Sequence, residues 1–357
     1  MSVLNFFAAL VLLFFVWSLT VRHGSKKLTC SRSFSCTRVF EGEQGELVEV
    51  VRNDGPYVIP WLRVESRISP NIRLGKQENL QSSGEMYYYS CFTLFPYQQI
   101  RRRHRVTFLR RGFYNLGNAY LTTGDLLGVS RFGKEQQLET PILVFPRILE
   151  PEELPFPVSQ MMGDMLRRNQ LLKDPFLIRG IRDYQSGDPV RDIHWAATAR
   201  TGTLQVRVND STVRTRLLVV LNVQHDDNQW SNLIQEKNVQ PIEDGIRLAA
   251  SLCVYTLRAG LAAGFATNMP REGEKESVVQ LPADGTVQED VLLDSFARLH
   301  VHCSEKFLTL LDRLTVHTGM DILILSGYDS EDIRESMEKL KSAGNRVSFY
   351  KMEGGSQ

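Results

Sequence analysis

The chain has 357 residues, 42% of them hydrophobic and 23% charged, and a formal net charge of +1. This length suits about two domains with buried cores, and the balanced charge gives no global reason to expect a nucleic-acid partner. The scattered cysteines include no CxxC pair, which argues against a disulfide framework or a zinc site and indicates a reducing compartment: Cys30, Cys36, Cys91, Cys253 and Cys303.

The first predicted element is an uncharged stretch of 18 residues, residues 4–21. This length is just enough to cross a hydrocarbon core of about 30 Å. A signal peptide is disfavoured because residues 1–3 carry no charge. Basic residues follow the stretch at Arg22, Lys26 and Lys27, so the positive-inside rule places the body of the protein in the cytoplasm. Residues 1–27 are therefore predicted to be a single-pass membrane anchor with a basic flank.

Residues 28–146 show the alternation of apolar and polar side chains that is typical of strands. Residues 46–51 alternate and precede a turn at residues 53–56, residues 61–68 alternate again, and residues 86–95 are rich in aromatics. Several further short runs follow without a convincing helix. This pattern predicts a β-sandwich domain of immunoglobulin-like shape.

A basic cluster lies within this β-rich region. Charge runs usually face water, so a solvated hairpin is one interpretation. Contact with anionic lipid headgroups and docking to an acidic protein are two others. The cluster contains Arg101, Arg102, Arg103 and Arg105, with His104 between them and Arg110 and Arg111 close behind.

Residues 147–216 combine a linker rich in proline and glutamate with an unusual module at residues 182–208. Asp188 and the proline after it favour a helix start, residues 190–200 suit a helix, and Gly202 is placed to end it. This module carries cations, carboxylates and amphipathic aromatics within a short span, which indicates either a buried polar network or a recognition surface. Its signature residues are Arg182, Tyr184, Gly187, Asp188, Arg191, His194, Trp195 and Arg200.

Residues 217–357 alternate between strand and helix patterns. Residues 217–221 form a continuous apolar run, as in a strand covered on both faces, and residues 242–259 carry a strong apolar stripe at helical spacing. The alternation predicts a mostly parallel sheet with helices on both faces. Further strands are expected at residues 264–268, 278–281, 321–325 and 346–350, and helices at residues 288–299, 305–314 and 331–343.

The signature residues carry a resemblance to a known family. The run Arg-x-Tyr-x-x-Gly-Asp-Pro-x-Arg-x-Ile-His-Trp, followed by Ala-Arg-x-Gly-x-Leu, resembles the bacterial domain-of-unknown-function family 58, and residues 110–128 resemble its lead-in. The resemblance implies amino-terminal membrane helices, a β-rich segment, a von Willebrand factor A-like α/β domain and a MoxR-type AAA+ ATPase partner. The chain departs from the family pattern at Ala196, where lysine is frequent, and in having one hydrophobic helix where a pair is frequent.

The resemblance also identifies the positions at which a divalent cation would bind. A von Willebrand factor A-like first strand typically ends in Asp-x-Ser-x-Ser, and the corresponding residues here are Asn222, Gln224 and Asp226, with Ser326 after a later strand. Magnesium requires several hard oxygen ligands, so the altered positions should weaken the site severely. We expect the fold to persist without its ion. Two alternatives stay open: metal-dependent ligand binding, and a different metal or acid–base site that includes His225.

Enzyme motifs are absent from the sequence. It contains no phosphate-binding loop, no Gly-x-Ser-x-Gly elbow and no HExxH. A hydrolase-type enzyme using Asp188 and His194 is an alternative, but their separation of six residues does not place them on one helical face. We therefore expect no catalytic residue, cofactor, nucleic acid or small-molecule substrate. The expected function is a membrane-anchored adaptor or scaffold in a cell-envelope or complex-assembly process.

Overall fold

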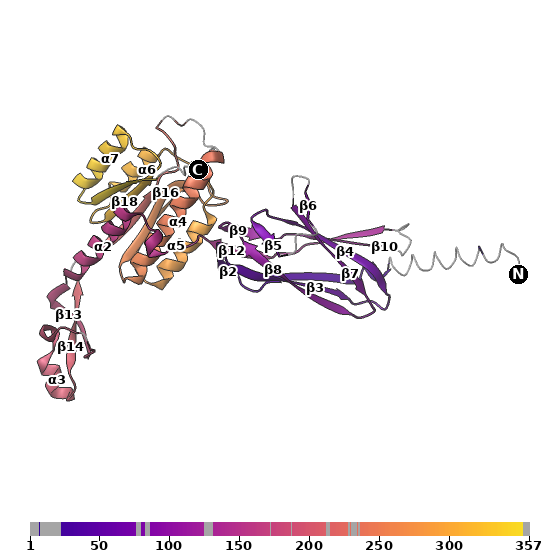
Figure 1. The fold of residues 1–357 in the computed structure, drawn as a ribbon, viewed down its shortest axis with the longest axis horizontal. Helices are drawn as coiled ribbons and strands as arrows, with labels where there is room; N and C mark the ends of the chain where they lie inside the picture. The colour runs from indigo at the N-terminus through magenta and orange to yellow at the C-terminus, as the bar shows by residue number, and fades with distance from the viewer. Residues whose placement is uncertain are drawn as a thin grey trace. The chain divides into compact units, whose positions relative to one another are not determined.

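The computed structural model divides the chain into two compact units, Met1–Arg147 and Ile148–Gln357 (Figure 1). The predicted membrane anchor, residues 4–21, lies outside the described residues except for Phe7. Within the described part, no helix is both long and apolar enough to cross a membrane. The structure describes residues 7, 23–75, 80–82, 86–124, 131–171, 173–186, 188–211, 215–227, 229, 234 and 236–352.

The first unit is a β-sandwich. One sheet has the strand order β1-β3-β8-β5, a second has the order β11-β10-β4-β7-β6, and a small third sheet has the order β2-β12-β9. The strands are β1 (Leu28–Phe34), β2 (Arg38–Phe40), β3 (Gln44–Asn53), β4 (Ile59–Ile68), β5 (Ile72–Leu74), β6 (Leu80–Ser82), β7 (Met86–Leu94), β8 (Gln99–Phe108), β9 (Gly112–Asn115), β10 (Ala119–Gly124), β11 (Arg131–Gln136) and β12 (Pro141–Phe145).

Alternating side chains of the two larger sheets form its core. Leu47 and Phe108 of the first sheet pack with Tyr88 of the second, and Val51 packs with Leu62 in a neighbouring cluster. The period-two pattern predicted the strands, and in each of them successive residues point to opposite faces. The predicted β-sandwich is thus present.

A polar network lies between these two sheets. Arg32 donates two hydrogen bonds to one oxygen of Glu49, at 2.9 and 2.6 Å, and both side chains are almost fully buried. The Nε2 atom of His104 lies 4.0 Å from the other Glu49 oxygen, and the His104 ring contacts the hydroxyl of Tyr88. Burial lowers the pKa of His104 from its ordinary value.

The second unit contains a five-stranded sheet with the order β17-β16-β15-β18-β19, in which every pair is parallel except β16 with β17. Its elements are η2 (Pro151–Glu153), α2 (Phe156–Leu171), β15 (Arg216–Leu221), α4 (Glu236–Arg258), β16 (Ala262–Pro270), β17 (Ser277–Ala283), α5 (Thr286–Arg298), α6 (Phe307–Leu314), β18 (Asp321–Ser326), α7 (Glu331–Ser342) and β19 (Arg346–Lys351).

Helices cover both faces of this sheet. Leu217, Val219 and Leu221 of β15 pack with α2, α4 and α5, whereas Leu218 and Val220 pack with α6 and α7. The first strand, β15, lies between β16 and β18, so the order in which strands are added reverses at the β15–β18 pair. Ligands of doubly wound sheets usually bind at such a reversal, outside the carboxyl ends of the strands.

The same unit also contains a two-stranded antiparallel sheet of β13 (Lys173–Asp183) and β14 (Gln205–Ser211). The 3-10 helix η3 (Val190–Asp192) and the helix α3 (Trp195–Thr201) lie between these strands in the sequence. We call residues 181–207, with these two helices and the adjoining strand ends, the signature module.

We predict that the stability of the first unit decreases as the pH falls below about 6.5, the pKa of a free histidine. Since the folded state holds His104 at a lowered pKa, the unfolded state binds the proton first and acid favours unfolding. Pulse proteolysis in urea at about pH 7 and about pH 5.5, read from peptides of the first unit, measures this loss. A His104→Gln variant should lose less stability over this range, and an equal loss in the variant would contradict the assignment.

Candidate functional site

The turn of the signature module is held by Asp188 and Arg182. The two side chains form a bidentate ion pair with both distances at 2.7 Å, and Asp188 also accepts a hydrogen bond of 2.9 Å from the backbone N–H of Gln185. The hydrogen bond that Arg182 donates to Asp188 raises the pKa of Arg182. The carboxylate of Asp188 therefore stabilises the turn.

The helical part of the module differs from the prediction of one helix over residues 190–200. It forms two pieces, η3 and α3, and Asp188 caps neither of them, because its carboxylate faces Arg182 and Gln185. His194 is the N-cap of α3 instead, and its Nδ1 atom accepts a hydrogen bond of 3.1 Å from the backbone N–H of Ala197. Gly202 ends α3 in the left-handed conformation, as predicted.

Large apolar side chains of the module face solvent. Trp195 is 62% exposed and Val190 is 68% exposed, and Ile181 and Leu204 are also exposed. Few apolar side chains among the described residues of the module are buried. Ile193 is one of them, and it forms a β-bridge with Val206. A surface of this kind is typical of a recognition site.

The remaining signature residues complete this surface. The Arg191 side chain is 85% exposed and lies 3.9 Å from Asp192, whereas Asp188 is paired with Arg182. Arg200 is exposed and Tyr184 is half-buried, while Gly187 lies outside the described residues. Asp188 is bonded to Arg182, and His194 to the backbone N–H of Ala197. A catalytic nucleophile or general base would instead be directed at a substrate.

A second candidate region is the β15–β18 reversal, where the degenerate metal positions lie. Asn222 and Ser326 are buried and joined by a hydrogen bond of 3.1 Å from the Asn222 amide to the Ser326 hydroxyl. The Asn222 carbonyl oxygen accepts from the backbone N–H of Gln224, and the Gln224 carbonyl oxygen accepts from the backbone N–H of Phe307 at 2.6 Å. Asn268 of β16 also donates to Asn222.

This network does not fit a magnesium ion. The carbonyl oxygen of Asn222 is used by Gln224, so its other terminal atom must be the NH₂ group, a donor. Asp226 is exposed and pairs with His225 at 3.0 Å, and Asp227 accepts from Ser330. Burial raises the pKa of Tyr328, whose hydroxyl is hydrogen bonded to Asn222 and Asp227. An amide donor and internally bonded oxygens provide the wrong ligands for a hard cation.

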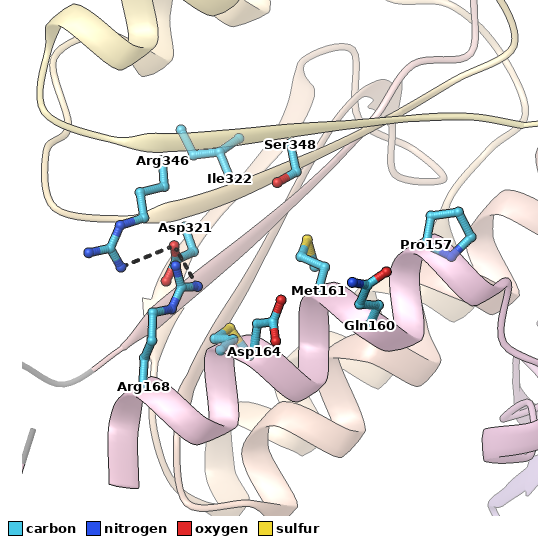
Figure 2. A pocket seen from close by; sticks show the side chains of 10 residues that line it. Pro157, Gln160, Met161, Asp164, Arg168, Asp321, Ile322, Arg346 and Ser348 are labelled. Atoms are coloured by element: carbon cyan, nitrogen blue, oxygen red, sulfur yellow. Dashed lines mark hydrogen bonds and ion pairs between the residues drawn. The ribbon is translucent and has the colours of Figure 1, made fainter. Parts of the chain in front are cut away.

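A pocket of about 420 Å³ lies at the other end of these strands, between α2 and the first residues of β18 and β19 (Figure 2). Arg168 of α2 and Arg346 of β19 both point toward Asp321, at 3.4 and 3.8 Å. No sequence pattern indicates this pocket, because Arg168 and Asp321 are 153 residues apart. Its arginines are compensated by Asp321, with Asp164 on the same wall, so it offers no unbalanced charge to a ligand.

The predicted basic cluster lies on β8 and is divided between two environments. Arg101, Arg103 and Arg105 are exposed at alternate positions of the strand. Arg102 instead stacks 4.1 Å above the ring of Phe92 and donates to the carbonyl oxygen of Cys91. The cluster is therefore a strand and not a hairpin turn.

We predict that Asn222→Asp destabilises the second unit by about 1–3 kcal/mol, because it buries a carboxylate and removes the donor to Ser326. Magnesium should not restore this stability, and calorimetric titration of the wild-type chain with Mg²⁺ or Mn²⁺ should show no stoichiometric binding. Pulse proteolysis in urea with and without Mg²⁺ measures the first effect, and Gln185→Glu, an amide-to-acid change at an exposed residue, is its control. Rescue of Asn222→Asp by Mg²⁺ would contradict this account of the site.

Comparison with known proteins gives a family for part of the chain. No curated protein matches the sequence. Among solved structures, the CARDB domain of a Pyrococcus furiosus protein is 14% identical, with 33% of this chain and 93% of that chain covered and a TM-score of 0.22. A Salmonella alpha-2-macroglobulin is 17% identical, with 34% and 7% covered and a TM-score of 0.24. AvmM, from alchivemycin A biosynthesis, is 12% identical, with 35% and 93% covered and a TM-score of 0.24.

These TM-scores are too low for any argument about function. The sequence match is more specific, since residues 180–281 match the family described as "Protein of unknown function DUF58". The matched range includes the signature module from Ile181 onward, together with β15, α4 and β16. This match over residues 180–281 supports a DUF58 family protein.

Proposed function

We propose that this DUF58 protein is a non-enzymatic adaptor that binds a protein partner through its signature module. The observation that carries the proposal is the exposure of Trp195 at 62% in a module whose ion pair, Arg182 with Asp188, is already satisfied internally. Exposing an indole to water forgoes the free energy of burying it. A partner surface that covers Trp195 would recover this energy.

The chemistry of the surface fits a protein partner. Tryptophan and arginine are enriched among the residues that dominate binding energy at protein interfaces. Trp195 and Arg191 are both exposed, and the exposed Val190 adds apolar area near them in the sequence. The family resemblance suggests that the partner is a MoxR-type AAA+ ATPase.

The non-enzymatic part of the proposal rests on how the candidate catalytic groups are used. Asp188 holds Arg182, His194 caps α3, and Asn222 joins the buried amide network. The α/β unit would then be a von Willebrand factor A-like scaffold that needs neither cofactor nor metal. The strand order, with reversal at β15 and β18, is compatible with such a scaffold.

The proposed location is the cytoplasmic side of the cell membrane, with residues 4–21 as a single anchor. The absence of charge in this stretch and the basic flank after it support the proposal. All five cysteines are free, and Cys30, Cys253 and Cys303 are buried, which suits a reducing compartment. We expect a role in a cell-envelope or complex-assembly process.

We predict that Trp195→Ala weakens binding to the MoxR-type ATPase encoded beside this protein about 30-fold, the effect of losing roughly 2 kcal/mol at a central interface residue. Biolayer interferometry with the full-length chain measures the change. Arg191→Ala should also weaken binding. The stability of the chain should stay unchanged in both variants, because both side chains are exposed.

A matched pair of valine variants tests whether binding depends on the signature module or on any exposed apolar residue. Val190 and Val316 belong to the same unit and are 68% and 80% exposed. Val190→Ala should weaken binding, whereas Val316→Ala should leave it unchanged. Undiminished binding of Trp195→Ala and Arg191→Ala would exclude the signature module as the docking surface.

A further inference from the structure

The outer face of the sheet β1-β3-β8-β5 carries a row of five arginines. On β8, Arg101, Arg103 and Arg105 alternate with inward residues, since Val106 and Phe108 belong to the core. Neighbouring strands supply two more outward arginines, Arg52 of β3 and Arg73 of β5, whose strand neighbours Val51, Ile72 and Leu74 are buried. We call Arg52, Arg73, Arg101, Arg103 and Arg105 the arginine row.

Strand register extends the row along the whole of β8. Arg73 is opposite Thr107 at one end, and Arg52 is opposite Gln99 at the other. The row therefore occupies five successive outward levels, at the positions of residues 107, 105, 103, 101 and 99. Alternate residues of a strand are about 6.8 Å apart, so the row is about 27 Å long.

Few acidic groups compensate this charge. Arg52 pairs with Asp54 at 2.5 Å, and Arg103 lies 3.9 Å from Glu46, which faces outward on β3. Arg73, Arg101 and Arg105 are exposed and form no ion pair with another described residue. The basic side chains thus dominate the face, although the charge of the chain as a whole is close to zero.

We propose that the arginine row binds the anionic phospholipid headgroups of a bilayer. Guanidinium groups form bidentate, charge-assisted hydrogen bonds with phosphate. Basic residues near an anionic membrane surface each contribute a modest attraction, so a row of them acts together. Alternate residues of a strand point to the same face, so the sheet presents these guanidinium groups on one side. Contact with a planar array of phosphates requires such an arrangement.

Two other partners fit the face less well. A protein interface usually has an apolar or aromatic centre from which charged residues are depleted. Here Arg101, Arg103 and Arg105 occupy the middle of the face, beside Val48 and Val50. Single-stranded nucleic acid requires aromatic side chains on which bases stack. The outward residues of β1 are Thr29, Ser31 and Ser33, and none of the outward residues described on β1, β3, β5 and β8 is aromatic.

The inference rests on one part of the proposed function, the anchor at residues 4–21, which would keep the β-sandwich near a bilayer. A tether raises the effective concentration of lipid, so weak contacts suffice. Two further arginines of the same unit are not part of the row: Arg102, which is exposed but stacks on Phe92, and the buried Arg32, which pairs with Glu49.

The test uses the full-length chain in lipid nanodiscs made either of phosphatidylcholine alone or of phosphatidylcholine with phosphatidylglycerol. Modification of individual arginines by phenylglyoxal is followed by mass spectrometry. We expect Arg101, Arg103 and Arg105 to react about fivefold more slowly in the anionic discs, the strength of one basic residue at an anionic surface. Arg191, an exposed arginine of the other unit, should react equally in both. About 0.5 M salt should remove the protection.

A charge variant strengthens the test. Glu46→Gln removes the acid beside Arg103, so the ratio of the neutral-disc to the anionic-disc rate at Arg103 should rise. Equal rates at the row in both kinds of disc would overturn the inference. So would protection that appears only in native membranes, since it would identify an acidic protein as the partner. A chain that leaves both kinds of disc on carbonate extraction would instead contradict the proposed anchor.

Discussion

The second unit depends on a hydrogen bond between two buried side chains, from the amide of Asn222 to the hydroxyl of Ser326. It connects the carboxyl ends of β15 and β18, the point at which the order of the sheet reverses. A carboxylate at residue 222 would need a cation or another donor to be stable in such a buried position. An amide satisfies its neighbours without one, so the sheet keeps its geometry while the usual ligand-binding position is closed by its own side chains.

Because this position is closed, the side chains that could contact a ligand or partner lie in other parts of the chain. The exposed groups lie on the signature module, which presents Trp195 and Arg191, and on the outer face of the sheet that contains β8. Neither surface holds, among its described residues, a pair of side chains arranged for proton transfer, and both are rich in groups that bind other macromolecules or lipids. This distribution is compatible with the proposed scaffold, because the interactions of a scaffold have to be accessible from outside.

Much of the fold follows from periodicity. The apolar run at residues 217–221 lies in β15, and the predicted helix of residues 242–259 coincides with α4 up to its last residue, Arg258. The alternation in the β-rich part placed the strands of the sandwich, since a period of two is visible in each strand alone. Asp188 was wrongly expected to cap a helix, because a local pattern does not reveal that Arg182 captures its carboxylate. The helix consequently begins at Trp195, with His194 as the cap.

The sites show the same division between local and long-range information. The neighbouring arginines of β8 are visible in the sequence, but the contribution of Arg52 and Arg73 depends on strand register. The pocket beside α2 could not be predicted at all, since its charged residues come from elements far apart in the chain. The sequence identified the residues of the signature module, whereas their exposure is a tertiary property that only the structure provides.

The departure from the family pattern at Ala196 can now be interpreted physically. Ala196 is exposed and directly follows Trp195 in the first turn of α3. A lysine there would be unfavourable for the helix itself, because cations are disfavoured near a helix N-terminus. The alanine of this chain retains the helix and removes one positive charge next to the exposed indole.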